Sequence, residues 1–388
     1  MDGQGLFYRD TWVEVDLDCI AENVQQMRKY LSNDVELMAV VKANAYGHGD
    51  VQVAETALKE GASYLAVAFM DEAIALRQKG IVAPILVLGA SRPEDVNIAA
   101  QHQITLTIFQ LDWLEKARKL LNQNANVTIH IKLDTGMGRI GIKEKKELQA
   151  LESIMLEDSR FKIEGMYTHF ATADEPNNNL FYNQQLERFR TMISWLDAMP
   201  RMIHASNSAG AMKGANAHFN AIRFGIGMYG LTPSLEMEPH LPFPLKEAFS
   251  LHSRLIHVKQ ISKGETISYG ATYEAKEDEW IGTLPIGYAD GWIRKLQGQE
   301  VIINGIRVPI VGRICMDQCM IKLPFKVDVG TVVTLIGSQG DEKVSVNEIA
   351  QRLDTINYEI PCIISDRVPR IYKRDGRAVE LKNSVLTF

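Results

Sequence analysis

The chain has 388 residues, of which 46% are hydrophobic and 23% charged, and its net charge is −6. This composition is ordinary for a globular protein, and the length allows two domains or one large domain with an appendage. The negative charge gives no support to a nucleic-acid partner, which usually calls for a basic face, so a small-molecule ligand fits better.

Short apolar strands separated by helix-period stretches fill the first part of the chain. A helical segment at Asp18–Leu31 comes first, and stretches such as Asp71–Arg77 and Trp113–Ala117 lie between strands. The expected strands are Val35–Val41, Tyr64–Ala68, Ile85–Leu88, Thr105–Ile108, Val127–Leu133, Ile163–Tyr167, Met202–Ala205 and Ala221–Phe224. Eight strands alternating with helices favour a (β/α)8 TIM-type barrel over an open doubly wound sheet. No GxGxxG follows the first strand, which weakens a dinucleotide-binding version of the sheet.

A proline-rich connector ends this pattern. Four prolines fall between Pro233 and Pro244, which is typical of a linker. The strands expected beyond it are rich in β-branched residues: Phe249–Ile261, Trp280–Ile286, Glu300–Ile303, Arg307–Ile310, Met320–Leu323 and Thr331–Ile336. Ser345 and Glu348 form a capping-box pattern before one helix. We therefore expect an α/β barrel over residues 1–240 and a mainly β domain over residues 241–388.

The four cysteines do not form a recognisable redox or metal motif. Cys19, Cys315, Cys319 and Cys362 include no CxxC pair, and no second ligand pair completes a zinc site. We expect reduced thiols in a cytoplasmic protein. No run of about 18 apolar residues predicts a membrane span, and the first ten residues lack the pattern of a secretory signal.

The most informative position is Lys42, at the end of the apolar strand Val35–Val41. A lysine there is costly unless it is exposed, paired or neutralised. A partly desolvated amine suits a nucleophile or base, and a solvated strand terminus is the plainer alternative. The residues around Lys42 decide between the two.

The segment VVKANAYGHG, residues 40–49, closely resembles the pyridoxal-phosphate attachment motif of the alanine racemases. Other motifs of that family are matched by KLDTGMGRIG, THFATAD, RFGIGMYG, SYGATY, PIGYADGW, GRICMDQ and TINYEIP. The resemblance runs from Phe7 to about Arg370. It implies an isomerase that carries pyridoxal 5'-phosphate, interconverts L-alanine and D-alanine, and supplies D-alanine for peptidoglycan.

In a barrel, the residues that follow the strands meet at one mouth and build the site. Those residues are Lys42, Lys132, Asp134, Arg139, Tyr167, His169, Asn207, Ser208, Arg223, Gly225 and Ile226. Barrel loops after strands seven and eight often bind phosphate, and a small hydroxyl with glycine N–H groups suits that role. Ordinary tight turns are the alternative. A phosphate cradle together with Lys42 is consistent with pyridoxal phosphate.

Racemisation needs a base on each face of the substrate Cα. The resemblance assigns one face to Lys42 and the other to Tyr269 from the other subunit, and so implies a homodimer with shared active sites. The usual pKa of tyrosine is near ~10, so Tyr269 needs help from cations such as Arg223. Without the family motif, Tyr269 would be read as a strand or turn aromatic.

The resemblance also distributes the binding roles. It implies that the cofactor phosphate is bound by Tyr46, Ser208, Gly225, Ile226 and Tyr358, and that His169 and Asn207 also lie at the cofactor. Arg223 would face the pyridine nitrogen, where a fixed cation disfavours protonation. His169 would link Arg223 to this network, and a packed core histidine is the alternative.

Substrate contacts follow from the same resemblance. Arg139 and the N–H of Met316 would hold the substrate carboxylate, with Met316 and Asp317 coming from the partner. The corridor to the site would include Tyr288, Arg294, Arg313 and Asp174. In many relatives the lysine at position 132 is carbamylated and orients Arg139, and a plain ammonium paired with Asp134 is the alternative.

Three other functions stay open at this point. A decarboxylase with the same two domains would lack the pairing of Lys42 with Tyr269. A serine-directed or broader racemase would differ at few residues. A pyridoxal-phosphate carrier built from a single barrel would end near the connector, whereas this chain continues for about 140 residues.

Overall fold

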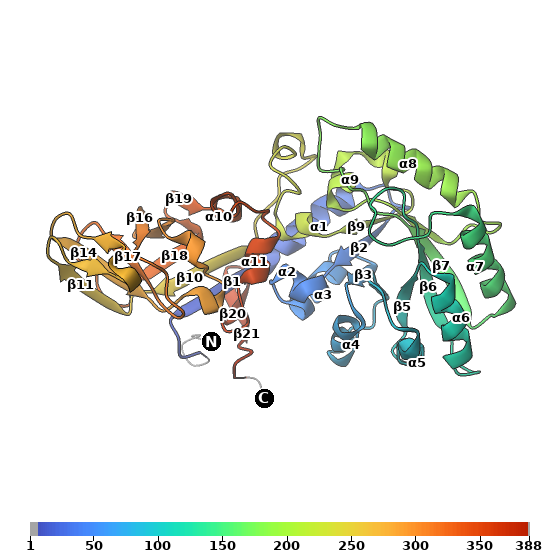
Figure 1. Cartoon of the computed structure of the whole chain (residues 1–388), viewed down its shortest axis with the longest axis horizontal. Helices are drawn as coiled ribbons and strands as arrows, with labels where there is room; N and C mark the ends of the chain where they lie inside the picture. Colours follow the sequence, from blue (N-terminus) through green and yellow to red (C-terminus); the bar gives the residue numbers. More distant parts are fainter. Residues whose placement is uncertain (1–6, 387–388) are drawn as a thin grey trace. The chain divides into compact units, whose positions relative to one another are not determined.

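The computed structural model describes residues 7–386. The chain forms two compact units (Figure 1). The barrel unit comprises Ile20–Ala45 and Asp50–Lys246. Of the described residues, the β unit comprises residues 7–19, the short segment Tyr46–Gly49, and residues 247–386.

The barrel unit is a closed ring of eight parallel strands in chain order. The strands are β2 (Glu36–Val40), β3 (Tyr64–Val67), β4 (Ile85–Val87), β5 (Ile104–Ile108), β6 (Val127–Lys132), β7 (Phe161–Tyr167), β8 (Met202–His204) and β9 (Ala221–Phe224). Parallel pairing of β2 with β9 closes the ring. The predicted barrel is confirmed, and every predicted strand is present with its ends shifted by no more than two residues.

Helices cover the outside of this ring (Figure 1). They are α1 (Leu17–Tyr30), α3 (Asp50–Lys59), α4 (Met70–Gln78), α5 (Val96–Gln101), α6 (Leu111–Leu120), α7 (Lys145–Glu157), α8 (Leu180–Ile193) and α9 (Ser208–Lys213). The longer helices bury an apolar stripe, as Leu114 and Ala117 of α6 show. Strands such as β3 are buried along their whole length, which is why they read as unbroken apolar runs.

The β unit is built on an eleven-stranded sheet in the order β11-β14-β17-β16-β15-β18-β10-β1-β20-β21, with β19 paired to β18. Its strands are β1 (Thr11–Asp16), β10 (Phe249–Arg254), β11 (His257–Ile261), β14 (Glu279–Leu284), β15 (Glu300–Ile303), β16 (Ile306–Val311), β17 (Cys319–Leu323), β18 (Val332–Gln339), β19 (Glu342–Val344), β20 (Arg370–Arg374) and β21 (Arg377–Lys382). A separate ribbon pairs β12 (Thr266–Ile267) with β13 (Tyr273–Glu274). The mainly β character of this part is confirmed.

Several features of the β unit differ from the sequence pattern, since β19, β20, β21 and the β12–β13 ribbon were not expected. Strand β1 was not anticipated, and it lies between β10 and β20 in the sheet. The expected long strand Phe249–Ile261 is two strands, because β10 pairs with β1 and β18 whereas β11 pairs with β14. Pairing partners far along the chain therefore decide where a strand is broken.

The remaining elements are short. Helix α10 (Val346–Leu353) has half of the predicted capping box: the Ser345 hydroxyl accepts the Glu348 N–H at 3.0 Å, whereas the Glu348 carboxylate accepts from Gln299 and Arg307. Helix α11 (Glu359–Ile363) follows it. The 3-10 turns are η1 (Pro93–Asp95), η2 (Ala215–Ala217), η3 (Ile226–Tyr229), η4 (Glu238–His240), η5 (Tyr269–Ala271), η6 (Tyr288–Asp290) and η7 (Arg294–Leu296). Within residues 7–386, no helix has the length and apolarity needed to cross a bilayer.

Candidate active site

The carboxyl ends of the barrel strands bring the predicted residues to one face of the barrel unit. Lys42 follows β2, Lys132 ends β6, His169 follows β7, and Asn207 follows β8. Arg223 lies within β9, and Gly225 and Ile226 come directly after it. In a parallel barrel these ends share one face, which is where such folds build their sites.

Lys42 begins an unusual turn, α2 (Lys42–Tyr46). Ala43, Asn44 and Ala45 have φ values of 53°, 52° and 51°, in the left-handed region. Each such non-glycine residue costs roughly 1–2 kcal/mol, so the fold must hold the turn in place. The Glu72 carboxylate accepts the Ala43 N–H at 2.7 Å and thereby anchors it. Backbone strain of this kind is characteristic of functional sites.

Arg223 is the central cation of the barrel mouth, with only 3% of its surface exposed. Its Nη2 donates to the carbonyls of Thr168 and Ala205, each at 2.8 Å, and its Nη1 donates to His204 Nδ1 at 2.7 Å. Among the described residues, nothing accepts a hydrogen bond from its Nε. Burial lowers the pKa of Arg223 to about 10, so it stays charged at neutral pH and keeps one donor for a ligand.

His169 does link to Arg223, as the sequence predicted. The Arg223 Nη2 donates to His169 Nδ1 at 3.3 Å. Burial holds the pKa of His169 well below its usual range, and the cations Arg223, Lys132, Arg139 and Lys42 lower it further. His169 is therefore a neutral acceptor for Arg223.

Lys132 is buried without a carboxylate partner among the described residues. Its Nζ donates to the Leu133 carbonyl at 3.3 Å and lies 4.8 Å from the centre of the Tyr167 ring. Asp134 instead pairs with Lys143 at 3.4 Å, so the ammonium–Asp134 pair is not formed. Burial lowers the pKa of Lys132 well below its usual range, and nearby Arg223 and Arg139 add to that shift.

The loops after β8 and β9 place small donors side by side. The Ser208 hydroxyl accepts the N–H groups of Gly225 at 2.9 Å and Gly227 at 3.3 Å, which ties the two loops together. Ser208 and Ile226 are the first residues of α9 and η3, so no helical carbonyl accepts their N–H groups. Asn207 caps α9 by accepting the Gly210 N–H at 2.9 Å. This arrangement suits an anion.

Two predicted cofactor residues belong to the β unit. Tyr46 and Tyr358 have ring centroids 6.2 Å apart. Burial is the main cause that raises the pKa of Tyr46, and the Cys362 thiol adds to it. Tyr46 is thus a neutral hydrogen-bonding hydroxyl.

The β unit also carries the predicted second base. Tyr269 is 70% exposed and Met316 is 53% exposed. Tyr269 sits in a strained turn, since Ser268 and Ala271 have φ values of 69° and 48°. The Ser268 hydroxyl fixes this turn by donating to the Arg313 carbonyl at 2.6 Å. Exposed apolar side chains on a strained, fixed turn are consistent with a surface built to be covered.

The neighbouring residues have identifiable partners. The Met316 carbonyl accepts the Ala289 N–H at 3.1 Å, whereas its own N–H meets no acceptor in the described part of the chain. Asp317 pairs with Arg367 at 2.8 Å, and Tyr288 begins η6. Two other predicted corridor residues lie in different units. In the barrel unit, the Asp174 backbone carbonyl accepts a hydrogen bond from the Ser234 hydroxyl at 2.6 Å. In the β unit, Arg294 is the first residue of η7.

Sequence reasoning missed several polar residues behind these groups. His130 and His204 lie inside barrel strands and are fully buried. Tyr167 was noted only as a strand end, yet its ring stacks on His204 with centroids 4.6 Å apart. A histidine within a strand that is buried on both faces was the available signal, because an unpaired polar group there is costly.

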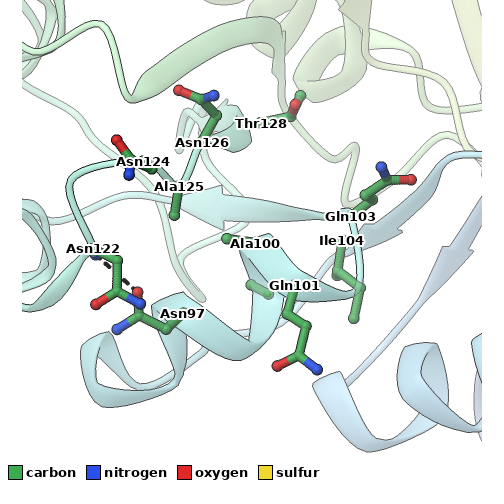
Figure 2. Close-up of a pocket in the computed structure, with 11 residues that line it drawn as sticks. Asn97, Ala100, Gln101, Gln103, Ile104, Asn122, Asn124, Ala125, Asn126 and Thr128 are labelled. Carbon is green, nitrogen blue, oxygen red and sulfur yellow. Dashed lines mark hydrogen bonds between the residues drawn. The ribbon is translucent and has the colours of Figure 1, made fainter.

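A separate hollow of about 660 Å³ lies at the N-terminal ends of β5 and β6 (Figure 2). Amide side chains dominate its lining, and the Asn97 side chain accepts the Asn122 N–H at 2.9 Å. None of its lining residues ionises at ordinary pH. This hollow therefore offers no acid–base chemistry, in contrast to the opposite end of the barrel.

Comparison with known proteins gives a consistent result over nearly the whole chain. Residues 15–233 match the family description "Alanine racemase, N-terminal domain", and residues 248–372 match "Alanine racemase, C-terminal domain". The chain is similar to alanine racemases of Geobacillus kaustophilus and Geobacillus stearothermophilus, each 58% identical over 379 residues. Those alignments cover 98% of this chain and 98% and 97% of the two relatives.

The fold gives the same result. The crystal structure of an alanine racemase from Bacillus anthracis with bound L-Ala-P superposes with a TM-score of 0.96 at 52% identity. The superposition covers 98% of this chain and 99% of that one. The likeness therefore includes both units.

Proposed function

This chain belongs to the alanine racemase family and is an isomerase of that family, and from this premise we propose that it interconverts L-alanine and D-alanine by a two-base mechanism. Lys42 of one subunit and Tyr269 of the partner serve opposite faces of the substrate Cα. Two separate observations support the proposal: Lys42 lies at the barrel mouth, and Tyr269 is 70% exposed on a turn that the Ser268 hydroxyl fixes.

The residues present fit pyridoxal 5'-phosphate. The open Nε of Arg223 suits a ring nitrogen, and the N–H groups of Ser208 and Ile226 suit a phosphate. Tyr46 and Tyr358 are proposed to add hydroxyls for the phosphate, with Gly225, His169 and Asn207 holding these loops. When bound, the cofactor supplies an aldehyde that reacts with amines and a ring that delocalises the electron pair left on Cα.

The protein's own groups would orient the substrate and move its protons. Arg223 is a fixed cation, so it would disfavour protonation of a ring nitrogen beside it and would thereby restrain side reactions at the substrate Cα. Arg139 and the N–H of Met316 orient the substrate carboxylate. Lys42 and Tyr269 take a proton from one face and return one to the other.

Lys132 is proposed to be carbamylated. A lysine must be neutral to attack carbon dioxide, and its burial beside Arg223 and Arg139 favours the neutral amine. The nitrogen bonds to the carbon of CO₂, one oxygen takes up the electron pair, and the nitrogen releases a proton. The resulting anion would compensate Arg139. Incorporation of ¹³C-bicarbonate, seen by NMR and lost in Lys132→Ala, would support this assignment.

The direct test measures the formation of D-amino acids from L-amino acids. Purified protein with pyridoxal phosphate is incubated with L-alanine and separately with L-serine, and the enantiomers are resolved. Fast appearance of D-alanine with little D-serine supports the proposal, and comparable D-serine shows a broader racemase. No D-alanine from protein that visibly binds cofactor would favour a carrier or a decarboxylase.

The shared site has its own test. Lys42→Ala and Tyr269→Phe should each lose racemisation, while Tyr269→Phe keeps its cofactor. Mixed dimers of the two variants regain one intact site, so statistical mixing predicts about a quarter of wild-type activity. Mixtures that stay inactive would show that both bases come from one chain. A homodimer, a cytoplasmic location and a role in supplying D-alanine for peptidoglycan belong to the same proposal.

A further inference from the structure

A line of buried polar groups runs through the barrel core from Arg223 to the opposite end of the strands. Arg223 Nη1 donates to His204 Nδ1 at 2.7 Å, and His204 Nε2 lies 2.8 Å from His130 Nδ1. His130 Nε2 is 3.5 Å from Glu164 Oε2. His204, His130 and Glu164 have no role in the proposed chemistry.

The chemistry of each group fixes the direction of this line. A guanidinium only donates, so His204 Nδ1 accepts and its proton sits on Nε2. His204 Nε2 therefore donates to His130 Nδ1, which leaves the His130 proton on Nε2, facing Glu164. Burial lowers the pKa of both histidines, so each carries a single proton. Every donor points away from Arg223 and toward one carboxylate.

The backbone of β7 is irregular at Glu164, where the line ends. In the pairing of β6 with β7, Ile129 opposes Ile163 and His130 opposes Gly165, so Glu164 is the extra residue of a β-bulge. A bulge re-aims the side chain it carries. At Gly165, an added Cβ would lie 2.6 Å from the His130 ring. The bulge and the glycine together leave room for the ring beside the carboxylate.

Glu164 is itself held from two sides. The Tyr64 hydroxyl donates to its Oε2 at 3.0 Å, and Arg201 Nη2 donates to its Oε1 at 3.0 Å. Its side chain is 15% exposed, and the nearby side chains of His130, Tyr64 and Arg201 lower its pKa to about 2 despite its partial burial. The carboxylate is therefore a permanent anion at the end of the line.

We propose that His204, His130 and Glu164 form a one-directional relay, hydrogen-bonded from Arg223 to His130 and electrostatic between His130 Nε2 and the Glu164 carboxylate 3.5 Å away, that fixes the Arg223 guanidinium where it faces the cofactor ring. His130 and Glu164 are positioning residues, since neither touches substrate or cofactor, and the inference rests on the proposed function for what Arg223 faces. The anion keeps the His130 proton on Nε2, and this keeps His204 Nδ1 open as an acceptor. If either ring carried its proton on Nδ1, two donors would face each other and Arg223 would be displaced.

The first experiment needs no turnover. Neutron diffraction from crystals of the full chain, grown both with and without pyridoxal phosphate, locates the exchanged deuterons on His130 and His204. The relay requires a deuteron on Nε2 of both rings and none on Nδ1. A deuteron on Nδ1 of either ring would overturn the proposal, whatever reaction the protein catalyses.

The second experiment compares two carboxylates of the barrel unit, Glu164, which is partly buried, and Glu152, which is buried. Glu164→Gln removes the charge of the relay, whereas Glu152→Gln removes a carboxylate that only accepts the N–H groups of Asp197 and Ala198. For Glu164→Gln we expect kcat for alanine to fall about tenfold, with KM changed less than about twofold. The absorption spectrum of the bound cofactor should shift in Glu164→Gln alone.

The outcomes separate the two proposals. Wild-type protein that neither binds pyridoxal phosphate nor racemises alanine contradicts the proposed function and leaves the deuteron positions as the test of the relay. An active wild type with unchanged kcat and spectrum in Glu164→Gln contradicts the relay alone. Lower thermal stability without those changes would show a structural role, and if the variant does not fold, the neutron result decides.

Discussion

Replacing Gly165 by alanine tests how tightly the barrel holds the His130 ring. The new Cβ would lie 2.6 Å from both Cε1 and Nδ1 of His130 and 2.8 Å from Nε2. Carbon contacts are comfortable from about 3.5 Å, so the ring must move by nearly 1 Å. His130 is fully buried and lies 2.8 Å from His204, which leaves it no direction of escape toward solvent.

The expected cost combines two terms. Overpacking of a filled core costs about 1–3 kcal/mol, and a buried donor that loses its acceptor costs about 1–3 kcal/mol more. Gly165→Ala should therefore destabilise the protein by about 2–6 kcal/mol. The melting temperature should fall by roughly 5–20 °C for a unit of this size.

Urea denaturation followed by circular dichroism measures this effect, and His130→Ala supplies the control. The double variant removes the ring that the new methyl group strikes, so its destabilisation should be smaller than the sum of the two single changes by about 1–3 kcal/mol. Stability of Gly165→Ala within about 0.5 kcal/mol of wild type, or strict additivity in the double variant, would refute the reasoning.

Three further predictions concern stability. Asp290 is fully buried, pairs with Arg9 at 2.8 Å and accepts the Gly287 N–H. Asp290→Asn should lower the free energy of unfolding by about 1–3 kcal/mol, less than for a fully buried pair, because water still solvates part of the Arg9 side chain. An unchanged urea midpoint would contradict this. Ser345→Ala should cost about 1 kcal/mol by removing the cap of α10, whereas Ser345→Asn should retain most of it; equal losses would rule out capping. Burial lowers the folded-state pKa values of His130, His169 and His204 below the ordinary value of 6.5. At a pH between the folded and unfolded pKa values, the unfolded chain therefore binds more protons than the folded chain. Stability should therefore rise with pH up to about 7 and then level off, and urea midpoints equal at pH 5 and pH 7.5 would contradict the assignment of neutral histidines.

The sequence alone determined the barrel and the location of its site. Eight apolar strands at helix-length intervals leave few other arrangements, because parallel strands need helical crossovers that cover both faces. The position of Lys42 at a strand end then followed from the topology, as did that of His169 and Arg223. Local chemistry also sufficed for the cap of α10, since Ser345 and Glu348 are three residues apart.

Tertiary structure decided what depends on distant partners. Strand β1 alternates Val13 and Val15 with Glu14 and Asp16, but its place between β10 and β20 is set by residues more than 230 positions away. The ammonium of Lys132 was expected beside Asp134 as one alternative, but the loop turns Asp134 toward Lys143. Sequence spacing carries no information about which way such a loop closes.

The line from Arg223 to Glu164 shows the same limit. His130, Glu164 and His204 come from three strands and meet only because the barrel closes and β7 is bulged. Sequence showed polar residues in buried strands but not their partners. The direction of their hydrogen bonds follows from the donor that starts the line and the carboxylate that ends it, and only the folded core brings those two together.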